Sequence, residues 1–134
     1  MPFTMDQPVL FRHCDPARIV FFPRYFEMLN DVTEAFFAEI GAPWQVLHKD
    51  HAVPTVALNT HFAAPSTHGD VLTFLQSLTR LGRTSITLLT TATCKDETRL
   101  TSEATLVHVN LSGRPEPWPD ELARALRTRL EPAP

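Results

Sequence analysis

The sequence predicts an α+β domain in which a curled five-stranded antiparallel sheet wraps around one long central helix, with a second helix at the C-terminus. Apolar residues recur every three or four positions over residues 25–40, which is typical of a helix, whereas strand-like alternation dominates after residue 54. Short connections between the later segments favour antiparallel pairing of consecutive strands. Such a sheet leaves an edge or face for a second copy to cover, so we expect a homo-oligomer.

The first strand is expected at "QPVLFR", residues 7–12, and the turn-forming "HCDP" ends it. The long helix follows, and one of its stripes carries apolar residues at helical spacing: Tyr25, Leu29, Val32, Phe36 and Ile40. Other apolar residues lie off this stripe, so the helix should be surrounded by other structure: Phe26, Met28 and Phe37. Gly41 and Pro43 are expected to end the helix.

The second half of the chain predicts four more strands and a final helix. The strand segments are rich in β-branched residues, with turn signals at Gly82 and "KDET": residues 56–63, 71–81, 84–94 and 100–111. "PDELARALRTRL", residues 119–130, predicts the final helix, because Asp120 lies in its first turn and arginines lie toward its end.

Composition limits the functional classes. The chain has 134 residues, 43% of them hydrophobic and 20% charged, with a net charge of −3, which indicates one soluble globular domain over residues 1–134. Without a basic run, neither nucleic acid nor an anionic membrane is an expected partner. We expect a cytoplasmic location, because no long apolar run or secretory signal pattern is present. Cys14 and Cys94 should be free thiols.

Metal, nucleophile and nucleotide motifs find little support. His48 and His51 are three residues apart in the loop "LHKDHAVP", without a further ligand nearby, so solvated histidines are expected there rather than a metal site. No GxSxG, phosphate-binding loop or dinucleotide fingerprint occurs. Cys14 follows His13 on an extended segment, where neighbouring side chains point to opposite faces, so a buried, inert cysteine is expected.

Asp15 has two explanations. It precedes Pro16, and an Asp-Pro pair can cap a helix or begin a turn without any chemistry. The following "ARIVFF" is apolar apart from Arg18, so the carboxylate would lie beside a low-dielectric surface, where a substrate carbonyl would feel its charge more strongly. From the residues alone, both a turn and a catalytic carboxylate remain open.

The segment "CDPARIVFFPRYFEMLNDVTEAFF" resembles a family signature, DPAGIV(F/Y)(F/Y)P followed by an aromatic-rich helix. This signature belongs to the 4-hydroxybenzoyl-CoA thioesterase family of hot-dog fold proteins. "FAAPSTHGDVL" and "LGRTSI" resemble the family's later landmarks, a proline turn before the third strand and the start of the fourth. The resemblance covers about residues 8–112 in order.

This resemblance implies an acyl-CoA thioesterase that hydrolyses an aromatic acyl-CoA (hydroxybenzoyl- or benzoyl-like) or a short-chain acyl-CoA to the free acid and CoA. It also implies a dimer or a dimer of dimers (a homotetramer), with sites between subunits and no metal or redox cofactor. Asp15 falls on the catalytic aspartate, which attacks the thioester carbon or activates water. Phe22 falls at the helix start, where a backbone N–H polarises the thioester carbonyl. Arg83 matches a basic position that contacts CoA phosphates.

Two further positions depart from the family pattern. Arg18 replaces a common glycine, so the turn after Asp15 is not expected to follow the same backbone path by default, and an outward Arg18 would bind CoA phosphate. Asn30 replaces the aspartate that accepts a hydrogen bond from a 4-hydroxybenzoyl substrate, so another aromatic or short-chain acyl group is an equal candidate.

Two rival functions remain. A hot-dog hydratase or dehydratase usually has a histidine a few residues beyond its aspartate, and "DPARIVFF" has none. A non-catalytic module that binds acyl-CoA or acyl carrier would use Asp15 only as a cap, and it would bind ligand without turnover.

Overall fold

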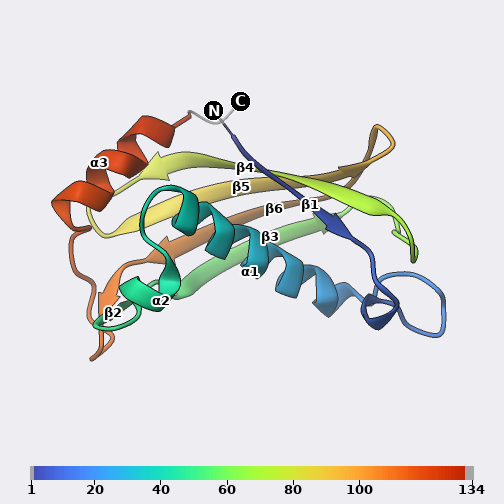
Figure 1. The fold of residues 1–134 in the computed structure, drawn as a ribbon, viewed down its shortest axis with the longest axis horizontal. Helices are drawn as coiled ribbons and strands as arrows, with labels where there is room; N and C mark the ends of the chain where they lie inside the picture. Colours follow the sequence, from blue (N-terminus) through green and yellow to red (C-terminus); the bar gives the residue numbers. More distant parts are fainter. Residues whose placement is uncertain (1, 132–134) are drawn as a thin grey trace.

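A computed structural model describes residues 2–131; the ends of the expected domain, residue 1 and residues 132–134, lie outside the described residues. Five antiparallel strands form the main sheet in the order β1-β4-β5-β6-β3 (Figure 1). Their bounds are β1 Phe3–Pro8, β3 Thr55–Phe62, β4 Val71–Leu81, β5 Ser85–Cys94 and β6 Glu97–Val107. The predicted five-stranded antiparallel sheet is therefore confirmed.

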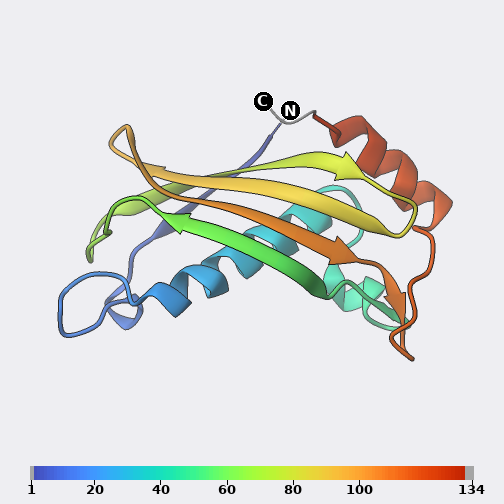
Figure 2. The same cartoon turned by 180° about the vertical axis from the view of Figure 1, so that it is seen from behind.

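Helix α1, Phe22–Glu39, lies across one face of this sheet, as the two opposite views in Figures 1 and 2 show. Its buried residues are those of the predicted apolar stripe up to Phe36, together with Met28 and Phe37. The helix is therefore the central core element that the sequence predicted. Its end is also as predicted, because Gly41 adopts a φ of 91°, a left-handed conformation that favours glycine.

The predicted first strand, residues 7–12, overlaps β1 only at Gln7 and Pro8 and was wrong over residues 9–12. Strand β1 ends at Pro8, and Phe11–His13 form a short 3-10 helix, η1. The reason is a local hydrogen bond, in which the Leu10 N–H donates to His13 Nδ1 at 2.9 Å and turns the chain. Two other short elements were not predicted, α2 Trp44–Leu47 and β2 His51–Ala52. The predicted strand over residues 100–111 is interrupted at His108, and its end forms β7, Val109–Asn110, which pairs with β2.

Strand pairing also differs from the expectation at one place. Consecutive strands β4, β5 and β6 pair as predicted, but β3 does not pair with β4 and instead pairs with β6 at the sheet edge. The connection over residues 63–70 is long enough to cross the ends of β6 and β5, and its N-terminal part is hydrogen-bonded to Arg99 O. Strand β3 consequently has apolar side chains exposed at an edge: Val56, Leu58 and Phe62.

Helix α3, Asp120–Arg129, confirms the predicted C-terminal helix. Leu122 and Leu126 are buried against a core cluster that includes Phe37 and Trp118, and Arg129 forms an ion pair with Glu39 of α1. Cys14 and Cys94 are free, as predicted, but Cys14 is only partly buried and not buried as expected. None of the helices in residues 2–131 has the length and apolar character needed to span a bilayer.

Candidate active site

Asp15 lies in a short antiparallel loop, residues 13–21, which we call the Asp15 hairpin. Its two arms are joined by a hydrogen bond from Phe21 N to His13 O at 2.9 Å and by another from Asp15 N to Ile19 O at 3.1 Å. Asp15 Oδ1 accepts a hydrogen bond from Ala17 N at 2.9 Å, which is an Asx turn. Asp15 therefore does begin a turn, but it does not cap a helix, because Phe21 is the N-cap of α1.

The tip of this hairpin requires an unusual backbone conformation. Arg18 has a φ of 68°, in the left-handed region, and its N–H donates to Asp15 O at 2.8 Å. A glycine would take this conformation without strain, so Arg18 occupies the backbone position that glycine favours, at a steric cost. The side chain of Arg18 is exposed and forms no ion pair within residues 2–131.

The Asp15 hairpin leads directly into α1, whose first turn has an unpaired donor. No side chain caps the helix at Phe21, and Pro23 has no N–H. Arg24 N donates to Phe21 O, whereas Phe22 N–H has no acceptor among the described residues. The helix start therefore presents one backbone N–H at the positive end of the helix dipole.

A buried ion pair anchors the hairpin to the rest of the fold. The hairpin is bound to the 63–70 connection through a hydrogen bond from Val20 N to Ser66 O at 2.9 Å. Arg99, only 7% exposed, donates from Nη1 to Ser66 Oγ at 3.1 Å and to Asp70 Oδ2 at 2.7 Å. The N–H of Thr67 and, next, the Arg99 guanidinium lower the pKa of Asp70. Arg99 therefore fixes the surface against which the hairpin rests.

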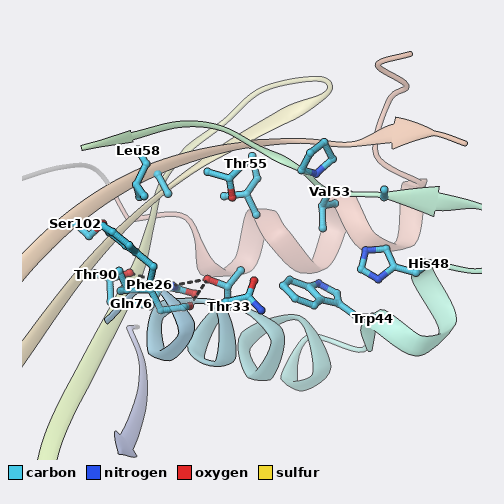
Figure 3. Close-up of a pocket in the computed structure, with 16 residues that line it drawn as sticks. Phe26, Thr33, Trp44, His48, Val53, Thr55, Leu58, Gln76, Thr90 and Ser102 are labelled. Atoms are coloured by element: carbon cyan, nitrogen blue, oxygen red, sulfur yellow. Dashed lines mark hydrogen bonds between the residues drawn. The ribbon is translucent and has the colours of Figure 1, made fainter. Parts of the chain in front are cut away.

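A cleft of about 490 Å³ begins one turn beyond the helix start. Figure 3 shows its walls, which come from α1, α2, the β2–β3 region and the inner face of β4, β5 and β6. Most lining side chains are apolar, including Phe26, Leu29, Trp44 and Leu58. Asp15 and Phe22 do not line this cleft, although α1 connects them to it. An apolar cleft with a few polar groups is the form that small-molecule sites take.

A polar cluster lies in the cleft between α1 and the sheet (Figure 3). Gln76 is buried there, and its Nε2 donates to Thr33 Oγ1 at 3.1 Å and to Thr90 Oγ1 at 3.0 Å. Ser102 and Thr60 share a hydrogen bond of 2.8 Å between their hydroxyls. Two buried atoms of lining residues, Gln76 Oε1 and Trp44 Nε1, have no hydrogen-bond partner within the described part of the chain.

The predicted site residues are spread over the length of the molecule. Asp15, Arg18 and Phe22 lie at the same end, and Asn30 is exposed on α1 where it lines the cleft. Arg83 lies in the β4–β5 turn, at the opposite end of the sheet from the start of α1 (Figure 1). Because the 18 residues of α1 span roughly 27 Å, Arg83 and Asp15 of one chain do not share a site.

Sequence reasoning missed four polar residues around the site, which are the buried Gln76, Thr90 and Arg99 and the partly buried Thr33. One signal was available for Gln76, because Leu72, Phe74 and Leu78 alternate as the inward positions of β4 and Gln76 falls in the same register. A polar residue at an inward strand position requires a partner or a ligand.

A second group of titratable residues lies near the other end of α1. His51 Nδ1 is 2.8 Å from Asp50 Oδ1, and its Nε2 is 2.9 Å from Glu116 Oε1. Hydrogen bonds to Asp50 and then Glu116 raise the pKa of His51, and its ring stacks on that of His108 at 4.6 Å. The expectation of a solvated loop histidine is therefore wrong for His51. We call Asp50, His51 and Glu116 the His51 cluster.

Comparisons with known proteins give consistent matches. The model of the thioesterase-like superfamily matches residues 9–126. A curated 4-hydroxybenzoyl-CoA thioesterase from Pseudomonas sp. (strain CBS-3) is 35% identical over 74 residues, which is 52% of this chain and 52% of that protein. The matched segment therefore spans about half the length of that relative.

Three solved structures are similar over nearly the whole chain. A 1,4-dihydroxy-2-naphthoyl-CoA thioesterase from Synechocystis has a TM-score of 0.87 at 20% identity, covering 95% of this chain and 96% of that one. A protein from Staphylococcus aureus in complex with CoA has a TM-score of 0.91 at 18% identity, covering 100% of this chain and 89% of that one. A mutant 4-hydroxybenzoyl CoA thioesterase complexed with 4-hydroxybenzoyl CoA has a TM-score of 0.86 at 23% identity, covering 93% of this chain and 98% of that one. At these identities the matches establish the hot-dog fold.

Proposed function

This chain belongs to the thioesterase-like superfamily, and from that premise we propose that it hydrolyses an acyl-CoA thioester to the free acid and CoA. One observation carries the proposal: the Asp15 hairpin leads straight into an α1 start whose Phe22 N–H has no protein acceptor. A carboxylate and an unpaired helix N–H on one continuous segment are the kinds of group that acyl transfer requires. The curated relative, matched over half its length, is named for the same reaction class.

The roles of these groups follow from their chemistry. Phe22 N–H would donate to the thioester carbonyl oxygen, and the positive end of α1 would stabilise the negative charge that develops there. Asp15 Oδ1 is held by Ala17 N–H, while Oδ2 accepts no hydrogen bond within residues 2–131. Oδ2 is therefore the atom that would act on the substrate.

Two mechanisms of hydrolysis would use this carboxylate. In one, Oδ2 attacks the carbonyl carbon, the C–S bond breaks and the CoA thiolate leaves; water then hydrolyses the mixed anhydride and regenerates the carboxylate. In the other, Asp15 accepts a proton from water as that water attacks the carbonyl carbon. In both routes the CoA sulfur gains a proton and the acid leaves as the second product.

We propose that the apolar cleft takes the acyl group. Its volume of about 490 Å³ and its apolar walls suit an aromatic or short-chain acyl group. Asn30 is exposed at this cleft, where its amide would meet a polar substituent that remains near the surface. Exposed Arg18 beside Asp15 would meet CoA phosphate outside the cleft.

We also propose a homo-oligomer, from the edge of the sheet and the position of Arg83. Strand β3 is an edge of the sheet, and an unpaired edge with exposed apolar side chains such as Val56 is a surface that a second copy would cover. Because Arg83 lies at the opposite end from Asp15, its proposed contact with CoA phosphates requires a site shared between two copies. A dimer would provide such a site, and a dimer of dimers would retain it.

The test is thiol release from a panel of aromatic and short-chain acyl-CoAs, measured on the wild type and on Asp15→Asn. Asparagine keeps the side-chain oxygen that accepts the Ala17 N–H, so the hairpin should persist. We expect the wild type to release thiol and kcat of the folded variant to fall about 10² to 10⁴-fold. Equal activity in both proteins would contradict the role of Asp15. Binding without release across the panel would favour a non-catalytic module.

A further inference from the structure

Gln76 lies at an inward position of β4, between the sheet and α1, and lines the cleft. It is 2% exposed, whereas Asn30, the residue expected from the sequence to bind a substrate hydroxyl, is exposed. Apolar neighbours occupy the adjacent inward positions, Phe74 and Leu78. A long polar side chain is therefore held inside an apolar layer, where its hydrogen bonds determine what it can bind.

The orientation of the Gln76 carboxamide follows from its partners. Thr33 Oγ1 donates its hydrogen to Leu29 O at 3.0 Å, so toward Gln76 it can only accept a hydrogen bond. The group that faces Thr33 must therefore be the Gln76 amide nitrogen, which donates to Thr33 at 3.1 Å and to Thr90 at 3.0 Å. Both N–H groups of Gln76 are occupied, which fixes the carboxamide and leaves its oxygen as the remaining polar atom.

Gln76 Oε1 is buried at the cleft and has no hydrogen-bond partner among residues 2–131. Buried acceptors without a partner are rare, and each requires an explanation. The nearby hydroxyls have other partners: Thr33 donates to Leu29 O, Ser102 shares a hydrogen bond with Thr60, and Thr90 accepts from Gln76 Nε2. A second unmatched atom, the buried indole nitrogen of Trp44, lies in the lining of the same cleft. The cleft therefore has polar atoms that the protein itself does not satisfy.

We propose that Gln76 determines acyl-group specificity, with Oε1 accepting a hydrogen bond from a hydroxyl or amino group on the acyl moiety. This inference rests on the proposed thioesterase function and adds the chemical character of the acyl group. A donor-bearing substituent satisfies the buried acceptor, whereas a methyl group of similar size leaves it unpaired. A carboxylate or carbonyl oxygen at that point is repelled, because two acceptors would face each other.

The experiment uses matched ligands that separate binding from turnover. Calorimetry would measure Kd for non-hydrolysable thioether analogues of CoA that carry hydroxyphenacyl or methylphenacyl groups, substituted at the 3- or the 4-position. The proteins are the wild type, Gln76→Met and the control Gln45→Met, in which the same change is made at an exposed position on α2 outside the cleft lining. Thiol release from the corresponding acyl-CoAs is measured in parallel and tests the proposed function separately.

We expect the wild type and Gln45→Met to bind one hydroxy analogue at least about tenfold more tightly than its methyl counterpart. Gln76→Met should reduce that ratio to about one, mainly by weakening the hydroxy analogue. Circular dichroism and thermal unfolding would show that the variant is folded. An unchanged ratio in Gln76→Met, a wild-type preference for both methyl analogues, or no binding of any analogue would overturn the role of Gln76. Analogue binding with the expected ratio but without thiol release would overturn only the hydrolytic function.

Discussion

The Asp15 hairpin combines a histidine with one carboxylate and the His51 cluster combines a histidine with two, yet the two regions differ in which atoms they leave unpaired. In the His51 cluster each ring nitrogen has a carboxylate partner, and Glu116 Oε2 also accepts a hydrogen bond from Asn110. At the hairpin, Asp15 Oδ2 and the neighbouring Phe22 N–H have no partner among the described residues. A cluster of titratable groups is therefore a weaker sign of a site than unpaired atoms with different roles.

The histidines of these two regions, His13 and His51, have pKa values shifted in opposite directions. Burial and, next, the charge of Arg12 lower the pKa of His13, so the neutral ring accepts the Leu10 N–H at 2.9 Å. Hydrogen bonds to Asp50 and Glu116 raise the pKa of His51. Both histidines hold local structure, and neither is placed to act on a substrate at Asp15.

The largest expected effect is on the anchor of the hairpin. Arg99→Leu leaves Asp70, whose side chain is only 15% exposed, without its cation, and should lower the free energy of unfolding by about 3 to 5 kcal/mol. The matched control, Arg24→Leu, breaks an exposed ion pair with Glu27 and should cost less than about 1 kcal/mol. Denaturant unfolding of both variants checks this difference. Equal losses of stability would mean that Arg99 does not anchor the hairpin.

The second largest expected effect is on kcat and concerns one backbone donor, the Phe22 N–H. Phe22→Pro removes the N–H at the first helical position, where proline is tolerated, and Phe21 already has the extended conformation that precedes proline. Phe22→Ala removes the same ring and keeps the N–H. We expect kcat to be about 10² to 10³-fold lower in Phe22→Pro than in Phe22→Ala. Similar kcat values in two folded variants would exclude this N–H from catalysis.

The smallest effect lies in the His51 cluster. Because the folded-state pKa of His51 is raised, its contribution to stability is complete below the unfolded pKa of about 6.5 and is lost as pH rises through the folded value. His51→Asn should therefore destabilise the protein more at about pH 6 than at about pH 9. Thiol release should change by less than about twofold. A large loss of turnover with stability unchanged would assign the cluster to catalysis.

The sequence predicted the features that depend on residues close together along the chain. The helical spacing from Tyr25 to Phe36 determined α1, because the buried face of a helix repeats every three to four residues. The resemblance around Asp15 and Phe22 also concerned one continuous segment. Its family glycine is replaced by Arg18, yet the structure shows positive φ at that residue, so the backbone path was encoded by the turn as a whole.

The rest depended on contacts between distant residues. Gln76 and Thr33 are 43 positions apart, and Arg99 and Asp70 are 29 apart, so no local period links them. The pairing of β3 with β6 was missed for the same reason. We expected strands that follow each other in the sequence to pair, but the 63–70 connection crosses the ends of two strands and separates β3 from β4. Strand β2 was also missed, because it has only two residues and two residues show no alternation of apolar and polar side chains.

The most direct test of the central claim is a comparison of Asp15→Asn with Asp50→Asn, the same change at the two ends of α1. The measurement is kcat/KM for thiol release, on one acyl-CoA that the wild type hydrolyses. If unpaired atoms mark the site, Asp15→Asn loses about 10² to 10⁴-fold and Asp50→Asn stays within about twofold of wild type. A loss in Asp50→Asn that equals or exceeds the loss in Asp15→Asn would contradict the assignment and place the chemistry at the His51 cluster.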